Sequence, residues 1–443
     1  MIPARKIIPY VIVFLIGFLS TYLLLTLFWP NSGETGPASL KIEGLWDKKV
    51  FNAIKTDFAK DHPQVTLTYE QKSLENYYSD IRAELDQGAS PDVFWWHSSW
   101  GPLLAANLAS LPSSVFSSSQ FEKTFYPITK TDLKIAGSYR GVPLEIDGLA
   151  LLYNKDTLTA KNFGGPPRTW TSLRADYVPS LTALDGQRLV SSAIALGADN
   201  NVSNVGEIAG LFMLQNGFSF TKSGSLNLAD PSQVKLAADA LSFYLNFSLT
   251  DHTWDNTQPG SIEAFARGKT AMIILPAYKI HDLLAFLKQN SLTLNFGVEA
   301  VPQLPSAPVI TWGSYWSLGV NEASTQKKAA WEFAKFVDEP ATLEKIYSLE
   351  SAADNLGRAY PRVDMASKQE GNIYLAAYLA QAKKAKSWYL NSDTFDKSLN
   401  DGNVAALKKA LIQIEKGNSA EGALKNFAND INPTLKKYGI VSQ

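Results

Sequence analysis

The chain has 443 residues, with 41 Lys and Arg against 42 Asp and Glu, so its formal net charge is −1. This balance provides no basic footprint for nucleic acid, and nucleic-acid binding is disfavoured. Cysteine is absent, which excludes a disulfide framework, a thiolate metal site, a cysteine nucleophile and a lipidated N-terminal cysteine. The length allows two domains or one two-lobed unit.

Residues 7–28 form an apolar run without charge, long enough at about 1.5 Å per residue to cross a bilayer core of about 30 Å. Arg5 and Lys6 precede the run and no basic residue follows before Lys41, which predicts a cytoplasmic N-terminus and an extracellular or periplasmic body. A cleaved signal peptide is the alternative, but the run is long and lacks a small-x-small site. We therefore predict a stub and transmembrane anchor over residues 1–30 and a tether over 31–39, at the cell membrane.

The next part of the chain alternates strand and helix patterns. In order, these are a strand over 40–46, a helix over 50–58, a strand over 65–69, a helix over 74–85 and a strand over 92–96. Asp47 can cap the first helix and His62-Pro63 ends it, and Gly88 ends the second helix. This order predicts an open α/β lobe. In such sheets ligands bind beyond the carboxyl ends of the strands. The segments that follow two of these strands, Trp46–Lys48 and Trp96–Gly101, are therefore candidate site segments.

A central stretch, 141–155, opens with an extended Gly-Val-Pro sequence and contains Glu145 and Asp147 before an apolar run over 149–152. If both acids lie on one strand, their spacing of two residues puts them on the same face. Such a strand either crosses a ligand cleft or carries catalysis. Beyond it, the sequence predicts a buried strand over 271–276, extended chain over 311–320, a helix over 331–337 and amphipathic helices between 372 and 438.

Six landmarks in this order resemble the sugar-binding family 1 of the extracellular solute-binding proteins of ABC importers, the group that includes maltose-binding protein. They are Phe58–Pro63, Gly88–Val93, Gly141–Asp156, Pro166–Trp170, Ala264–Met272 and Trp331–Val337. The resemblance extends from Leu40 to the C-terminus.

The resemblance implies an α/β fold of two lobes that close like a hinge, the type II periplasmic-binding-protein fold. We place one lobe at residues 38–146 plus 290–341 and the other at 147–289 plus 342–443. It also implies a bacterial carbohydrate-transport protein that binds a mono- or oligosaccharide and delivers it to ABC permease subunits. We expect a monomer that has no catalytic residues, cofactor or metal.

The resemblance also assigns candidate ligand contacts. Asp147 matches a carboxylate that holds a sugar hydroxyl, with Glu145 as a weaker candidate beside it. Tyr278 and Trp388 match stacking aromatics. The remaining candidates come from the first strand end, from other strand ends or turns near the cleft, and from a loop: Trp46, Asp47, Lys48, Trp96, Ser98, Trp100, Trp312, Tyr315, Trp316 and Arg358.

Two departures from the maltose-binding pattern stand out. Ser98 and Ser99 replace an acid and a base, and Val205-Gly206-Glu207 replaces aromatic residues at a helix start. These departures imply a sugar other than maltodextrin, or a different mode of binding.

Other functions are weighed against this interpretation. A membrane-anchored glycan-processing enzyme could use Glu145 and Asp147 as its two carboxylates. A ligand-sensing receptor of a signalling system could share the fold. Gly268-Lys269-Thr270 imitates the end of a phosphate-binding loop, but Glu263 occupies the position of the required upstream glycine. The four histidines show no metal-ligand spacing.

Overall fold

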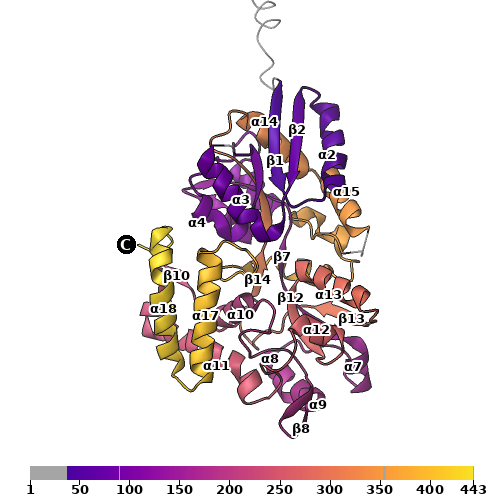
Figure 1. Cartoon of the computed structure of the whole chain (residues 1–443), viewed down its shortest axis with the longest axis vertical. Helices are drawn as coiled ribbons and strands as arrows, with labels where there is room; N and C mark the ends of the chain where they lie inside the picture. Colours follow the sequence, from indigo (N-terminus) through magenta and orange to yellow (C-terminus); the bar gives the residue numbers. More distant parts are fainter. Residues whose placement is uncertain (1–36, 89, 353–355, 443) are drawn as a thin grey trace, which may run out of the picture.

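The computed structural model describes residues 37–88, 90–352 and 356–442. Within them the chain forms two lobes stacked along the long axis of the molecule (Figure 1). The predicted transmembrane anchor lies outside the described residues. None of the helices in the described part is both long enough and apolar enough to cross a bilayer.

Lobe 1 is built on a five-stranded sheet with the order β2-β1-β3-β15-β6. Its central strands are parallel, and β15 and β6 are antiparallel neighbours. The strands are β1 (Ala38–Gly44), β2 (Val65–Gln71), β3 (Val93–His97), β6 (Val142–Pro143) and β15 (Trp316–Val320), with a small hairpin of β4 (Lys134–Ile135) and β5 (Ser138–Tyr139). The helices are α2 (Lys48–Asp61), α3 (Leu74–Gln87), η2 (Ser98–Trp100), α4 (Gly101–Leu104), α5 (Ser118–Thr124), α6 (Ile128–Asp132), α14 (Lys327–Val337), α15 (Pro340–Ser351) and η5 (Val363–Gln369).

The first elements of lobe 1 form where the local sequence predicts them. Helix α2 buries Val50, Ile54 and Phe58 on one side, and the Asp47 carboxylate accepts the Lys49 N–H at its start. Helix α3 ends at Gly88, whose positive φ of 72° suits a residue without a Cβ. These predicted elements are confirmed, since caps and apolar spacing together determine them.

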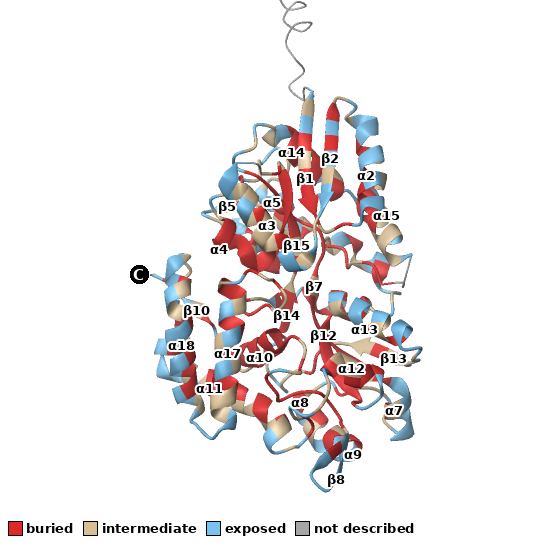
Figure 2. Cartoon of the chain, in the orientation of Figure 1, coloured by how far each residue is buried: buried red, intermediate tan, exposed pale blue. Residues whose placement is uncertain are grey.

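Lobe 2 is built on strand β7, which pairs antiparallel with β12, β13 and β14. The strands of this lobe are β7 (Asp147–Asn154), β8 (Ala183–Asp185), β9 (Arg188–Ser191), β10 (Thr221–Lys222), β11 (Ser225–Leu226), β12 (Met272–Pro276), β13 (Phe296–Glu299), β14 (Thr311–Ser314) and β16 (Ala385–Lys386). The helices are α7 (Lys155–Ala160), α8 (Trp170–Ser172), η3 (Leu173–Tyr177), α9 (Val178–Leu181), α10 (Val205–Gln215), η4 (Asn227–Ala229), α11 (Pro231–Leu249), α12 (Ser261–Ala266), α13 (Tyr278–Gln289), α16 (Ala376–Ala382), α17 (Leu399–Glu415) and α18 (Ala420–Lys437). The buried residues of both lobes gather on the strands and on the inner sides of the helices (Figure 2).

The chain crosses between the lobes from β6 to β7 and from β14 to β15, and it returns to lobe 2 between α15 and α16. Two segments lie in the opposite lobe from the sequence-based assignment. Residues 290–314 include β13 and β14, which pair with β7 in lobe 2. The second segment includes α15 and η5, which pack against α2 and α5 in lobe 1. The sequence of an apolar strand or an amphipathic helix does not indicate which lobe it belongs to. Its lobe is determined by contacts with elements far away in the sequence.

The central stretch is also less regular than predicted. Residues Leu144–Ile146 lie between β6 and β7, so Glu145 is not on a strand. The segment is held by hydrogen bonds from Leu144 N–H to the Trp316 carbonyl and from Ile146 N–H to the Ala359 carbonyl. The expectation that Glu145 and Asp147 share one strand face is therefore wrong.

Candidate ligand-binding cleft between the lobes

A hollow between the lobes is lined by two of the predicted site residues. It has a volume of about 350 Å³ and contains Asp47 and Arg358 in its wall. Its other lining residues are Leu45, Lys49, Val50, His281, Leu349, Glu350 and Gly357. His281 belongs to α13 in lobe 2, whereas Asp47 caps α2 in lobe 1. We call this space the Arg358 hollow.

Arg358 is the charged centre of the hollow. Its Nη1 lies 2.9 Å from a carboxylate oxygen of Glu145, and its Nε lies 2.9 Å from one of Glu350. The guanidinium carbon lies 5.0 Å from the centre of the Trp95 ring, which is a cation–π distance. Burial raises the pKa of Glu350 and Arg358 opposes that shift. Because Glu145 and Glu350 share one cation, the hollow keeps unsatisfied acceptor capacity for the hydrogen-bond donors of a ligand.

Asp147 stands at the first residue of β7 and joins two elements of lobe 2. Its carboxylate accepts the N–H groups of Gly148, Ala277 and Tyr278 at 2.6, 2.8 and 3.0 Å. Burial and the neighbouring Glu145 raise the pKa of Asp147 to about 7, against the opposing effect of the three donors. Asp147 therefore orients the start of α13, and with it Tyr278.

Tyr278 leads into a polar network that the sequence did not single out. Its hydroxyl receives a hydrogen bond from Asn204 Nδ2 at 3.2 Å and donates to Asp393 at 3.3 Å. Asp393 also pairs with Lys279 at 2.9 Å. The Tyr278 side chain remains 36% exposed, so its ring is available at the surface of lobe 2. Lys279 follows Tyr278 directly, but no local pattern connects either residue with Asp393.

The buried Glu207 explains one departure noted in the sequence. It accepts hydrogen bonds from Asn204 Nδ2 and from the backbone N–H and hydroxyl of Ser392. Burial raises the pKa of Glu207, and these donors oppose the shift. The residue supports the loop that carries Asp393.

Most of the predicted aromatic contacts lie inside the lobes. Trp46, Trp96, Trp100, Trp312 and Tyr315 are each at most 1% exposed. Trp96 packs on Gly141 and Gly319, and Trp312 packs on Gly210 and donates its Nε1–H to Asn391. Trp316 is half-buried, with its ring centre 5.1 Å from that of Trp100. Of these six residues, Trp316 is the one that is partly exposed, and the ligand roles of all six remain predictions.

Lys48, Ser98 and Trp388 do not line the Arg358 hollow, although Lys48 lies between two lining residues, Asp47 and Lys49, in the chain. Lys48 is exposed at the start of α2, where its backbone N–H donates to Gln71. Ser98 and Trp388 line a different hollow, of about 420 Å³, that shares no lining residue with the first. The structure therefore brings few of the predicted site residues together: some line one of the two hollows and others lie inside the lobes.

Sequence comparisons place the chain among binding proteins. A family model described as bacterial extracellular solute-binding protein matches residues 53–353. Binding proteins of Brucella abortus and Brucella suis are 23% identical over 297 residues, which cover 65% of this chain and 68% of each relative.

Solved structures share the two-lobed architecture. The cyclic alpha-maltosyl-1,6-maltose binding protein from Arthrobacter globiformis has a TM-score of 0.73 at 18% identity, over 91% of this chain and 100% of its own. The sugar-binding protein MalE from Xanthomonas citri has a TM-score of 0.71 at 16% identity, over 90% of this chain and 98% of its own. The GacH receptor of Streptomyces glaucescens, solved unliganded and with acarbose, has a TM-score of 0.68 at 17% identity, over 91% of this chain and 100% of its own. At these identities the likeness establishes the fold alone.

Proposed function

Since this chain belongs to the bacterial extracellular solute-binding proteins, we propose that it is a membrane-tethered receptor for a carbohydrate. It captures the sugar between its lobes and presents it to the permease of an ABC importer. The observation that carries this proposal is the Arg358 hollow, where charged side chains of one lobe face a helix of the other. The anchor is supported by the uncharged run over residues 7–28.

The hollow offers the chemistry that sugar recognition requires. Sugar hydroxyls bind charged hydrogen-bond partners inside a cleft, and sugar C–H faces pack on aromatic rings. Glu350 and Arg358 line the hollow, and Glu145 pairs with Arg358. The partly exposed rings of Trp316 and Tyr278 lie outside this lining, on opposite lobes. A ligand that touches both lobes stabilises the closed arrangement, which is how occupancy would be signalled to a permease.

The bonding of the two candidate catalytic carboxylates supports binding over hydrolysis. Glu145 is engaged by Arg358, and Asp147 holds the start of α13 through three backbone donors. A general acid must instead give its proton to a leaving group within hydrogen-bond reach. Both carboxylates therefore already bind partners within the protein.

A thermal-shift and Trp-fluorescence screen of the purified chain against mono- and oligosaccharides tests the proposal. A ligand at 100 times its dissociation constant should add about 2.7 kcal/mol to the free energy of unfolding. The same sugar should be recovered intact after long incubation.

Arg358→Met should weaken this binding at least tenfold, and Lys235→Met, on the outer face of α11, should leave it unchanged. Cleavage of a bound glycan that stops in Asp147→Asn would contradict the proposal in favour of an enzyme.

A further inference from the structure

A buried hydrogen bond joins the two lobes in addition to the chain crossings. Asn400, in the first turn of α17, donates from its Nδ2 to the hydroxyl oxygen of Ser99 in η2 at 2.9 Å. Helix α17 packs against α10, α11 and α18 in lobe 2, whereas η2 packs against α4 and α6 in lobe 1. Both residues are buried, with 0% of Asn400 and 5% of Ser99 exposed. The bond therefore links the lobes through protein atoms alone.

The Ser99 hydroxyl is oriented by its neighbour His97. The Ser99 Oγ lies 2.7 Å from His97 Nδ1, and the Ser99 backbone N–H donates to the same nitrogen at 3.3 Å. A ring nitrogen that accepts an N–H carries no proton, so the Ser99 hydroxyl donates to Nδ1 as well. Burial lowers the pKa of His97 to about 3, which keeps the ring neutral and Nδ1 an acceptor. The lone pairs of the Ser99 oxygen are therefore available to accept the hydrogen bond from Asn400.

The Asn400 amide is oriented from the side of lobe 2. Its Nδ2 also donates to the Asp396 carboxylate at 2.7 Å, and its Oδ1 accepts the backbone N–H of Asn391 at 3.2 Å. Asp396, which is 2% exposed, accepts the Asn400 backbone N–H as well. Both donors of the amide nitrogen are thus used, one of them across the lobes. Moving the lobes apart breaks that bond, and a buried amide that loses a partner costs free energy until water replaces it.

A second hydrogen bond joins the lobes near the first. Ser387, directly after β16, donates its hydroxyl to Asp132 at the end of α6 at 2.9 Å. Ser99, Asp132 and Ser387 all line the hollow of about 420 Å³ described above, so both bonds lie at its wall. In Figure 1, α17 and α4, which directly follows η2, lie to the left of β7, whereas α13 and α15 lie to its right. The elements around the Ser99–Asn400 bond and those that line the Arg358 hollow are therefore on opposite sides of β7 in this view.

We infer that these two bonds, and above all the Ser99–Asn400 bond, form a latch that favours the closed arrangement of the lobes in the ligand-free protein. Neither bond requires a ligand atom, so the latch stabilises the closed form before anything is bound. A closed state that is already populated reduces the free energy that a ligand must supply for closure. The inference depends on the two-lobed fold and not on which ligand the cleft binds.

A distance measurement between the lobes tests the latch. Because the chain has no cysteine, the double variant Ala83→Cys/Asn429→Cys carries one spin label on α3 and one on α18, both at exposed positions. Pulsed electron paramagnetic resonance then gives the distribution of label distances in the ligand-free, full-length chain. Into this background we place Ser99→Ala, Ser387→Ala and a control, Ser192→Ala. Ser192 is 2% exposed and its hydroxyl donates to the Thr253 carbonyl within lobe 2, so the control loses a buried hydroxyl without touching the other lobe.

The parent should show one main population at a short distance. Ser99→Ala should lower this population at least threefold in favour of longer distances. Ser387→Ala should shift it in the same direction but by less, because Ser387 is only half-buried. Ser192→Ala should leave the distances unchanged. Circular dichroism of each variant establishes that it is folded, and if Ser99→Ala does not fold, Ser387→Ala carries the test.

Three outcomes would overturn the inference. One is a parent whose main population is already at the longer distances. Another is that neither latch variant shifts the distribution, which would make both bonds permanent parts of the hinge. The third is that Ser192→Ala shifts it as far as Ser99→Ala, since the effect would then follow from lost stability in general. No ligand enters the measurement, so its result stands apart from the sugar screen.

Discussion

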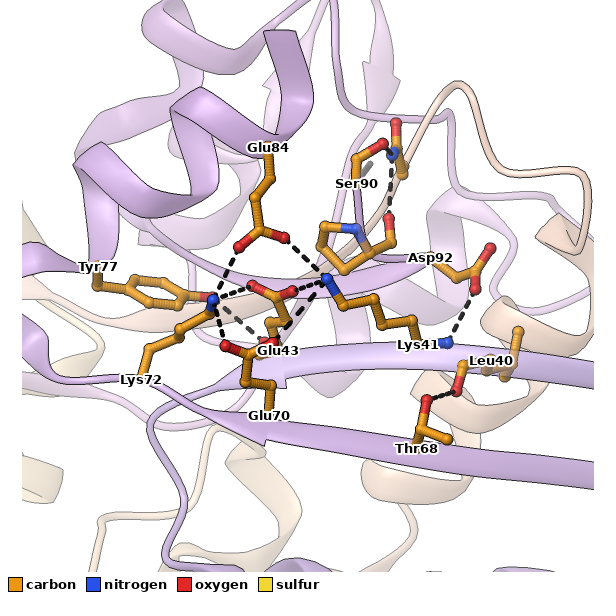
Figure 3. Close-up of polar contacts among 12 residues, drawn as sticks. Leu40, Lys41, Glu43, Thr68, Glu70, Lys72, Tyr77, Glu84, Ser90 and Asp92 are labelled. Atoms are coloured by element: carbon orange, nitrogen blue, oxygen red, sulfur yellow. Dashed lines mark hydrogen bonds and ion pairs between the residues drawn. The ribbon is translucent and has the colours of Figure 1, made fainter. Parts of the chain in front are cut away.

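Two clusters of charged side chains lie in this molecule, and their construction differs. The first, which we call the strand cluster, consists of Lys41, Glu43, Glu70, Lys72 and Glu84 (Figure 3). All five come from one β-α unit, the neighbouring strands β1 and β2 and the helix α3 that follows them. The second is Arg358 with Glu145 and Glu350, from three segments near the crossings between the lobes.

The strand cluster is closed, and each of its two lysines lies within 4 Å of all three carboxylates. The Glu43 side chain is fully buried, with Lys41 at 2.6 Å and Lys72 at 3.3 Å, and both lysines also reach Glu84. Oxygens of Glu43, Glu70 and Glu84 lie within 4.8 Å of one another, a spacing that would suit a cation. Lys41 and Lys72 already supply the positive charge there.

The Arg358 cluster is partly open to solvent and has a single cation. One guanidinium serves two carboxylates, and 30% of the Arg358 side chain is exposed. The comparison suggests that charges gathered by one local unit hold a lobe together, whereas charges gathered from the crossings respond to ligand and to lobe closure.

The largest effect is expected for Glu43→Gln. Gln keeps the volume but removes the charge that Lys41 and Lys72 share, and breaking a buried ion pair in this way costs about 3–5 kcal/mol. Urea unfolding should show this loss, with sugar affinity unchanged.

Glu70→Gln is the matched control for that variant. Glu70 belongs to the same cluster but its side chain is 52% exposed, so its loss should cost less than about 1 kcal/mol. If the two variants were equally stable, burial would not distinguish the members of the cluster.

Arg358→Met is expected to have an intermediate effect on stability and a large effect on binding. It leaves Glu145 and Glu350 facing each other without a cation and removes the contact with the Trp95 ring, a loss of about 2 kcal/mol. Chemical unfolding and saccharide titration should be run on the same preparation. A variant as destabilised as Glu43→Gln, but with normal affinity, would make the Arg358 cluster a purely structural feature.

The strand cluster and the Arg358 cluster also show what the sequence could predict. The elements around β1, α2, β2 and α3 follow from apolar spacing and from caps at Asp47 and Gly88, all within short stretches. Alternation along β1 places Lys41 and Glu43 on one face, yet the partnership with Glu84 depends on how α3 docks. Local sequence rules therefore predict where helices and strands form better than they predict which of these elements pack together.

The cleft was harder to predict because its residues meet only after the chain has crossed between the lobes. The position of Asp147 was predicted, but its bonds to Ala277 and Tyr278 depend on β12 lying beside β7. Asp393 adopts a positive φ of 55° in a loop with no recognisable motif. A tryptophan in a turn-rich sequence also carries no mark of whether its ring will be buried, so Trp96 and Trp312 could be named only as candidates, each more typical of the core than of a ligand contact.

The smallest effect on stability at pH 5, and one that changes with pH, is expected for Asp147→Asn. The pKa of Asp147 is raised from 3.8 to about 7, so the folded state binds this proton more tightly than the unfolded chain does. Its contribution to stability is therefore full below about pH 4 and is lost as the pH rises through 7. Asn resembles the protonated acid, so the free energy of unfolding of the variant should lie within about 1 kcal/mol of the parent's at pH 5 and should not decline between pH 5 and 8.

Melting temperatures of both proteins across this range measure the difference. A parallel decline in the variant would assign the pH dependence to another group, and Asp147 would then be an ordinary ionised cap of α13.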